Sequence, residues 1–146
     1  MNLPDMQQLA VATAAKFDID NALFCALCRH ESSWNTWAVR YEDGFYQRYI
    51  STMKLLTTTE MRMRAHSFGL GQIMGQTARE LGFSGDYLTE LCDPPKGLYF
   101  AAMKLQRCLK NKNGNFTDAL LEYNGGANLA YPGLVMAHYD VYRNPQ

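Results

Sequence analysis

The chain has 146 residues, and its 14 lysines and arginines are balanced by 14 aspartates and glutamates, so its formal net charge is zero. This length predicts one domain, over residues 1–146, with a single substantial core. The neutral balance lacks the basic excess typical of proteins that bind nucleic acids or membrane surfaces, so neither class of partner is expected. Aromatic residues make up 12% of the chain. That fraction is typical of an apolar core and is also compatible with a groove that stacks sugars.

The N-terminal residues lack a basic region followed by a long apolar run, so no signal peptide is expected. No apolar stretch approaches the roughly 20 residues that span a bilayer, and stable membrane insertion is not expected either. Among the four cysteines, Cys25 and Cys28 have the spacing of a redox pair or of half a zinc site. No second metal-binding motif follows, so we expect two small buried side chains in a helix.

Helices are predicted from the N-terminus onwards. Pro4 suits the first turn of one helix, and Asp20 is placed to cap a second helix. The dipeptide at 43–44 is Asp-Gly, a hairpin-type turn signal, so a small β-hairpin is predicted near residues 38–50. The strands of this hairpin would contain Val39, Tyr41, Phe45 and Tyr49.

Further helices are predicted over residues 53–65 and 73–81, the second stopped by Gly82. Asp93 precedes a proline and opens the clearest helix, in which apolar residues recur at helical spacing. One face of this helix is basic and contains Lys104, Arg107, Lys110 and Lys112. We expect this face to be solvated and favoured by the helix dipole, with contact to an anionic polymer as the alternative.

The last third of the chain predicts two more helices. Thr117 is placed to cap the first of them, which ends at the Asn-Gly-Gly sequence of residues 124–126. Pro132 is placed at the start of the final helix, which would continue through Tyr142. The chain therefore reads as one mostly helical domain without internal repeats.

Glu31 is the most informative residue. It lies seven residues after Phe24 and four after Leu27, so it continues the apolar stripe of the second predicted helix. A carboxyl group on a buried stripe is costly unless it is protonated or paired. Burial would raise its pKa and let it act as a general acid near neutral pH. The alternative from periodicity alone is pairing with Arg29, His30 or a distant lysine.

Three ordered segments carry a resemblance to a known family. Residues 27–35 read LCRHESSWN, residues 67–74 read SFGLGQIM, and residues 122–126 read EYNGG. They resemble the Glu-Ser, Gly-Leu-Met-Gln and Ala-Tyr-Asn-Ala-Gly segments of the soluble lytic transglycosylase domain, within the goose-type lysozyme-like superfamily. The resemblance covers roughly residues 20–142. It implies a mainly α (α+β lysozyme-like) fold, a single helical domain with a catalytic cleft.

The resemblance also implies a reaction, cleavage of the β-1,4 bond between N-acetylmuramic acid and N-acetylglucosamine in peptidoglycan. Glu31 would protonate the bridging oxygen and then take the proton of the muramoyl C6 hydroxyl, which closes a 1,6-anhydro ring. One acid suffices for this reaction, whereas ordinary glycosidases use a carboxylate pair. No cofactor and no metal are implied. The expected partner is the peptidoglycan glycan strand, and we expect a monomer that acts on the cell wall.

The other motif residues are expected to contact the substrate. They are Ser32, Ser67, Gly69, Gln72, Met74, Tyr123, Asn124 and Tyr139. Capping of a helix end is an alternative role for Ser32 and for Asn124, and core packing is an alternative for Met74.

One tyrosine near the C-terminus has a particular implied role. The resemblance implies that the Tyr139 hydroxyl reaches Glu31, with Tyr131 and Tyr142 as alternatives.

The chain also departs from the family pattern. Gly71 stands where the family usually has methionine, which removes a packing side chain beside Gln72.

Glu42, Asp43 and Glu122 are candidates for a second carboxylate. With such a carboxylate and a bound water, the same scaffold would act as a hydrolytic muramidase and leave reducing ends. A different class of function is a non-catalytic cell-wall-binding or virion structural module, which would have no need of a buried acid. We expect the transglycosylase.

The spacing of the motifs points to a subgroup. Glu31 and Gly69 are 38 positions apart, more than in the common enzymes of the family. The intervening segment, residues 40–64, resembles that of a phage and bacterial subgroup and is expected to form a flap over the cleft. This resemblance implies an enzyme that is phage-encoded and delivered to the wall by lysis machinery or a virion.

Overall fold

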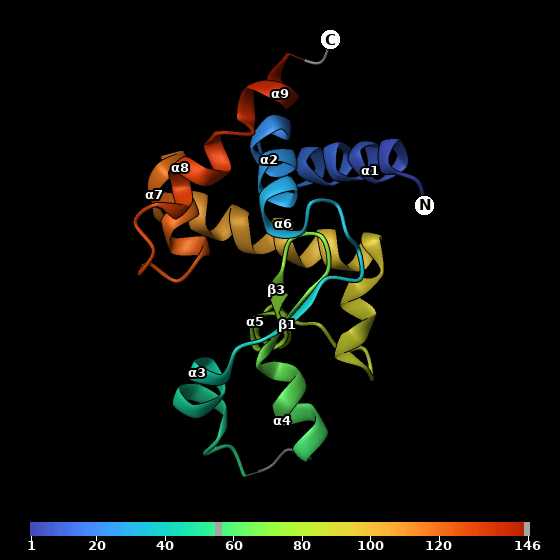
Figure 1. The fold of residues 1–146 in the computed structure, drawn as a ribbon, viewed down its shortest axis with the longest axis vertical. Coiled ribbons are helices and arrows are strands. Elements are labelled where there is room, and N and C mark those ends of the chain that lie inside the picture. Colours follow the sequence, from blue (N-terminus) through green and yellow to red (C-terminus); the bar gives the residue numbers. More distant parts are fainter. Residues whose placement is uncertain (55–56, 145–146) are drawn as a thin grey trace.

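The computed structural model describes residues 1–54 and 57–144, and most of these residues lie in helices (Figure 1). The longer helices are α1 (Leu3–Lys16), α2 (Asn21–Ser32), α4 (Thr58–Arg64), α6 (Pro94–Asn111) and α7 (Phe116–Tyr123). Shorter helical segments are α3 (Asp43–Phe45), η1 (Tyr46–Ile50), α5 (Gly75–Glu80), η2 (Leu88–Cys92), α8 (Tyr131–Met136) and α9 (Tyr139–Arg143). The strands are β1 (Val39–Tyr41), β2 (His66–Phe68) and β3 (Ile73–Met74). The predicted fold class, a mainly helical domain, is confirmed.

The first two helices begin where side chains cap them. The Asn2 side chain accepts a hydrogen bond from the Asp5 amide, 2.9 Å away, and Asp20 Oδ1 accepts one from the Leu23 amide at 2.8 Å. The cap predicted at Asp20 is thus confirmed, and it satisfies a backbone donor that α2 leaves free. Behind it, residues 22–28 of α2 are all buried, so this helix runs through the interior.

The hairpin predicted near residues 38–50 is wrong. Only its first strand exists, and β1 pairs antiparallel with β2, so that Arg40 lies opposite Ser67. The chain after β1 is helical instead, first in α3 and then in the π-helical segment η1. The rings of Phe45 and Tyr49 pack 4.9 Å apart between centroids. This i, i+4 contact is available in a helix and not in a strand.

The sheet is small and has the order β1-β2-β3. β3 pairs antiparallel with β2, with Ser67 opposite Met74. The helix predicted over 73–81 therefore begins only at Gly75, since residues 73–74 belong to the sheet. It ends before Gly82, whose φ of +100° suits a glycine stop. The helix predicted over 53–65 is α4, capped by Thr57, and residues 55–56 lie outside the described part.

Towards the C-terminus, the predicted end of α7 at Asn124 and the predicted helix start at Pro132 are confirmed, whereas the cap of α7 and the extent of the final helix are corrected. Asp93 and Pro94 open α6 as predicted. The cap of α7 is Asn115, whose Oδ1 accepts from the Asp118 amide at 2.9 Å, and Thr117 lies inside the helix. The final predicted helix is two short ones, α8 and α9. This break turns the tyrosines of α8 and α9 toward different neighbours.

Two apolar clusters hold the fold. The helical core consists of the buried apolar side chains of α1, α2, α6, α7 and α8 with Ile19, Trp34 and Leu70. The sheet core consists of Phe68, Ile73, Ala78, Phe83, Leu88, Leu91 and Cys92. Figure 1 shows the same division, with α1, α2 and α6–α9 at one end and the sheet with α3–α5 at the other.

Among the described residues, no helix has the length and apolar character needed to cross a bilayer.

Candidate active site

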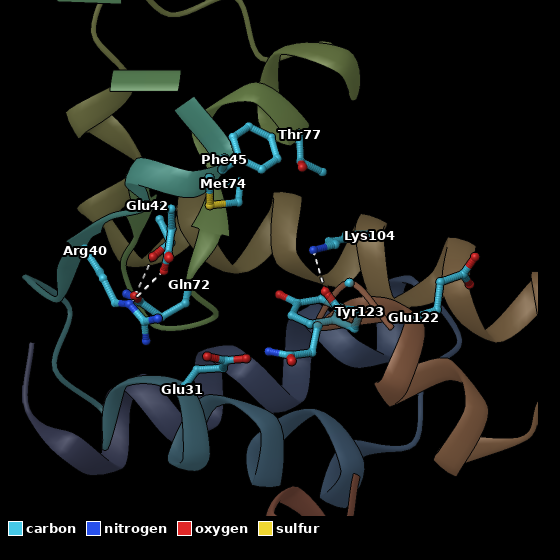
Figure 2. A pocket seen from close by; sticks show the side chains of 13 residues that line it. Glu31, Arg40, Glu42, Phe45, Gln72, Met74, Thr77, Lys104, Glu122 and Tyr123 are labelled. Atoms are coloured by element: carbon cyan, nitrogen blue, oxygen red, sulfur yellow. Dashed lines mark hydrogen bonds and ion pairs between the residues drawn. The ribbon is translucent and has the colours of Figure 1, made fainter. Parts of the chain in front are cut away.

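A cleft of about 490 Å³ lies between the helical part and the sheet part. Its lining residues come from α2, β1, α3, the sheet, α5, α6 and the end of α7. They are Glu31, Arg40, Glu42, Phe45, Ser67, Gln72, Met74, Thr77, Lys104, Glu122, Tyr123, Asn124 and Gly125. Figure 2 shows Arg40, Glu42 and Gln72 on one side, with Glu31 at the bottom of the view and Lys104 and Tyr123 opposite. The three sequence motifs therefore meet in one cleft.

Glu31 sits in the last turn of α2, where the buried stripe reaches the cleft. Burial raises the pKa of its carboxyl group above the usual range. A hydrogen bond from the Tyr131 hydroxyl to Glu31 Oε1 and the charges of Lys104 and Arg40 act in the opposite direction and lower the pKa. The result is an acid that retains its proton to higher pH than a solvated glutamate does.

The tyrosine beside Glu31 is Tyr131, and the expectation that Tyr139 reaches Glu31 is wrong. Tyr131 is the first residue of α8, it is buried, and its ring packs edge-to-face on His30 at 5.2 Å. The Tyr139 hydroxyl instead donates to Asp20 Oδ2 at 3.2 Å. The third candidate, Tyr142, accepts a hydrogen bond from Trp34 Nε1 at 2.8 Å. The break between α8 and α9 produces this division, and helical spacing alone does not reveal it.

Gln72 and Ser67 line the cleft and also lock its backbone. Gln72 Nε2 donates to the carbonyl oxygens of Ala38, 2.9 Å away, and Gly69, 3.0 Å away. Gln72 Oε1 accepts from Ser67 Oγ at 2.8 Å. The Gln72 and Ser67 side chains therefore use their hydrogen bonds to stabilise the turn between β2 and β3. Gln72 has a φ of +48° in this turn. Their predicted contact with the substrate stays a prediction.

The residues around this turn explain its glycines. A Cβ at Gly71 would lie 2.4 Å from the Ala101 Cβ, so α6 fills the space that a larger side chain would need. At Gly69 the φ is +70°, and a Cβ would lie 2.6 Å from the Leu91 carbonyl oxygen. Ser32 Oγ is 3.0 Å from the carbonyl oxygen of Leu70 and ties the end of α2 to the turn. Gly69 and Ser32 thus support the cleft from outside its lining.

Tyr123 and Lys104 form one unit in the wall of the cleft. The Tyr123 side chain is buried, and its hydroxyl donates to the Gly71 carbonyl oxygen at 2.7 Å. Lys104 Nζ donates to the Tyr123 carbonyl oxygen at 2.7 Å and lies 4.3 Å from the centroid of the Tyr123 ring. Burial lowers the pKa of this lysine. Lys104 therefore does not belong to a solvated basic face, which corrects the prediction for that residue.

A signal for the position of Lys104 was present in the sequence. The residues on the same side of α6 are small, with Gly97, Ala101 and Cys108 at intervals of about one or two helical turns. Small side chains in such a row mark a face that packs closely on its neighbours. Sequence reasoning missed Arg40, Phe45 and Thr77 as well, because their approach to the cleft depends on the sheet and on α3.

The three candidate second carboxylates lie in different surroundings. Glu42 lines the cleft but pairs with Arg40, with Oε1 2.7 Å from Nε. Asp43 accepts a hydrogen bond from the Tyr41 hydroxyl at 3.1 Å and is not among the lining residues. Glu122 accepts one from Asn111 Nδ2 at 3.1 Å, and its carboxylate is directed away from Glu31 in Figure 2. Among the three, Glu42 is therefore the one that lines the cleft without being directed away from Glu31 in Figure 2.

Asn124 and Met74 remain from the predicted site. Asn124 is exposed, lines the cleft and forms the C-cap of α7, so both of its alternative roles remain open. Met74 lines the cleft from β3 and is half-buried.

Cys25 and Cys28 are buried in α2, where burial raises the pKa of the Cys25 thiol to about 11. Within residues 1–54 and 57–144, no group of three or more His, Cys, Asp or Glu side chains is placed to hold a metal ion.

Comparison with known proteins adds the family to this geometry. The model of the transglycosylase SLT domain family matches residues 8–130, and this range contains Glu31, Gln72 and Tyr123. No curated protein and no solved structure matches the chain. The matched range covers most of the 146 residues and all three motifs. The chain therefore belongs to the transglycosylase SLT domain family, whose members are lytic transglycosylases that act on peptidoglycan.

Proposed function

We propose that this protein cleaves the β-1,4 bond between N-acetylmuramic acid and N-acetylglucosamine, with Glu31 as the single acid and base. Protonated Glu31 gives its proton to the bridging oxygen as the bond from C1 to that oxygen breaks. The muramoyl C6 hydroxyl then attacks C1, and its proton returns to the Glu31 carboxylate. No water is consumed, and the new end of the strand carries a 1,6-anhydro ring.

The observation that carries this proposal is the environment of Glu31. Its carboxyl group lines the cleft, burial raises its pKa, and Tyr131 donates a hydrogen bond to Oε1. That bond occupies one carboxyl oxygen and leaves Oε2 to carry the transferred proton. A group that serves as acid and then as base needs a pKa nearer to neutral than that of a free glutamate.

Hydrolysis is the second candidate, and Glu42 is the observation that favours it. A hydrolytic muramidase of the inverting kind needs another carboxylate that activates water. Glu42 lines the same cleft, but its Oε1 lies 2.7 Å from Arg40 Nε, so this ion pair already occupies an oxygen that would have to hold the attacking water. We therefore favour the anhydro product over the hydrated one.

The test is digestion of purified sacculi followed by mass analysis of the products. Wild type should release anhydro-muramoyl ends, lighter by one water than reducing ends. Glu31→Gln keeps the shape of the side chain and removes the acid, so the rate should fall at least ~100-fold. The matched control is Glu80→Gln on the exposed side of α5, which should retain the wild-type rate.

Each other outcome has a defined meaning. Reducing ends from the wild type, lost in Glu42→Gln, would establish the hydrolase. An unchanged rate in Glu31→Gln would contradict the proposed mechanism. Sacculi that bind wild type without any cleavage would establish the wall-binding module.

We also propose that the chain belongs to the phage and bacterial subgroup with a long segment between Glu31 and Gly69, and that it acts as a monomer at the cell wall.

A further inference from the structure

The cleft continues beyond Glu31 to a group of side chains that no step of the proposed reaction uses. Phe45 from α3, Met74 from β3 and Thr77 from α5 line this region. In Figure 2 these three side chains lie together at the end of the cleft opposite Glu31, with Glu42 between the two regions. They therefore form a surface distinct from the one that surrounds the acid.

The Phe45 ring is held by a contact with the Tyr49 ring. The two rings pack with 4.9 Å between centroids, and Tyr49 lies one helical turn further along the chain. The guanidinium group of Arg48 lies 5.3 Å from the centroid of the Tyr49 ring. Phe45 is half-buried although α3 has no fully buried residue, and its ring both borders the cleft and contacts the Tyr49 ring, which is tilted by 51° to it. A ring held in this way offers a fixed apolar face.

The chemistry of this region matches a pyranose ring. A sugar presents an apolar face of C–H groups and a rim of hydroxyl and acetamido groups, so its sites combine apolar contact with a few placed polar groups. Phe45 and Met74 supply the apolar contact, and the Thr77 hydroxyl supplies a donor and acceptor. Arg40 borders the same cleft and is largely exposed, with 73% of its side chain accessible. Its guanidinium keeps donors beyond the Nε that faces Glu42.

We propose that Phe45, Met74 and Thr77 form an additional saccharide subsite, which holds a sugar of the same glycan strand beyond the two sugars that the cleaved bond joins. This inference rests on the proposed function, because the cleft that holds the scissile bond leads directly into the subsite. Contact with a remote sugar adds binding energy that only strands long enough to reach it can use. The subsite therefore makes the enzyme prefer long strands to short ones.

The test compares strand lengths in the variant Phe45→Ala. Peptide-free glycan strands of defined length are cleaved by wild type and by the variant. For long strands, kcat/KM should fall about 3- to 10-fold, the range expected for loss of one aromatic stacking contact. For the shortest strand that wild type cleaves, kcat/KM should stay unchanged. Phe45→Trp keeps an aromatic face and should restore most of the length preference.

The control is Tyr87→Ala, which removes an exposed aromatic side chain outside the cleft and should leave both rates unchanged. Circular dichroism and the melting temperature verify that Phe45→Ala is folded. An equal loss on short and long strands would overturn the subsite, and so would an unchanged preference for long strands. An effect confined to strands that carry stem peptides would also overturn it, since the occupant would then be a peptide.

A binding measurement separates this inference from the proposed reaction. In the Glu31→Gln background, calorimetry gives the affinity for long and for short peptide-free strands without cleavage. Adding Phe45→Ala should weaken binding of the long strand about 3- to 10-fold and leave the short strand unaffected. This result would support the subsite even if wild type proved to be a hydrolase. Equal affinities with and without Phe45 would overturn the subsite whatever the reaction.

Discussion

The Glu31 carboxyl group is subject to opposing influences on its pKa, and Tyr131 is one that mutation can remove cleanly. Burial raises the pKa, whereas the hydrogen bond from Tyr131 lowers it. Glu31 donates its proton first, so kcat/KM should fall as pH rises through the pKa of the free enzyme. In Tyr131→Phe the lowering bond is lost and the pKa rises further. The alkaline limb of the kcat/KM profile should then move to higher pH.

The same variant should lower kcat about 10-fold, because a hydrogen bond to a charged group no longer orients the carboxylate. A pH–rate profile on soluble glycan strands measures both effects. Tyr142→Phe is the matched control, since that hydroxyl bonds to Trp34 and not to Glu31. An alkaline limb that stays in place in Tyr131→Phe, or moves to lower pH, would contradict the assigned role of this tyrosine.

At the scale of single residues, the sequence predicted the acid better than its neighbours. Periodicity places Glu31 on the apolar stripe of one helix, which is a local property, and the resemblance of its segment to the Glu-Ser motif of the family identified it as the acid. Tyr131, Tyr139 and Tyr142 all fit a C-terminal helix, and the choice among them depends on where α8 ends and how it packs on α2. Lys104 looked like part of a basic face because charge patterns do not show which side of α6 meets α7. The choice among the tyrosines depends on contacts between elements, which spacing does not encode, whereas the small residues on the Lys104 side of α6 were a signal that the charge pattern obscured.

At the scale of elements, the turn between β2 and β3 depends on its close approach to α6. A Cβ at Gly71 would lie 2.4 Å from Ala101. Gly71→Ala should therefore lower the free energy of unfolding by about 1–3 kcal/mol, as overpacking does elsewhere. The matched control is Gly133→Ala in α8, where nothing lies within 4 Å of the added Cβ. That change should stabilise the protein by about 0.5–1 kcal/mol.

Thermal or denaturant unfolding of both variants tests this prediction. If Gly71→Ala unfolds at the same temperature as wild type, the space at this position is not limiting. The glycine would then need another explanation than the packing of α6.

The elements themselves show which features a sequence reveals. The start of α2 at Asp20 and the start of α6 at Pro94 have strong local signals and were predicted correctly. The hairpin failed because the partner of β1 is β2, which lies more than 20 residues further along the chain. An Asp-Gly pair in this context opens a short helix, and a turn signal alone does not distinguish the two outcomes.

At the scale of the whole molecule, equal numbers of acidic and basic residues make the surface a poor electrostatic anchor. Binding should depend mainly on the cleft, so the activity on sacculi should vary less with salt than that of a strongly cationic lysin. Raising the ionic strength from about 0.1 M to about 1 M shortens the screening length from about 10 Å to about 3 Å. The rate over this range is the measurement.

A charge variant provides the comparison. Replacing Glu80 and Asp86 by lysine removes two negative charges and adds two positive ones at exposed positions outside the cleft, which raises the net charge by about four. This variant should bind the anionic wall more strongly at low salt and lose more of its activity as salt rises. An equally steep salt dependence in wild type would show that local charges, and not the cleft, govern binding.

The separation of the two apolar clusters has a consequence for how such an enzyme can diversify. Among the described lining residues of the cleft, Tyr123 is the one that belongs to either cluster as a buried member. Gln72 and Lys104 also bind the backbone around the cleft. Exposed lining residues such as Arg40 and Asn124, however, belong to neither cluster and can be replaced without loss of core packing. Selection can therefore alter the strand length or the sugar pattern that the cleft accepts at a small cost in stability. In this architecture, the residues that stabilise the fold are largely different from those that set substrate preference, so preference can change while the fold is kept.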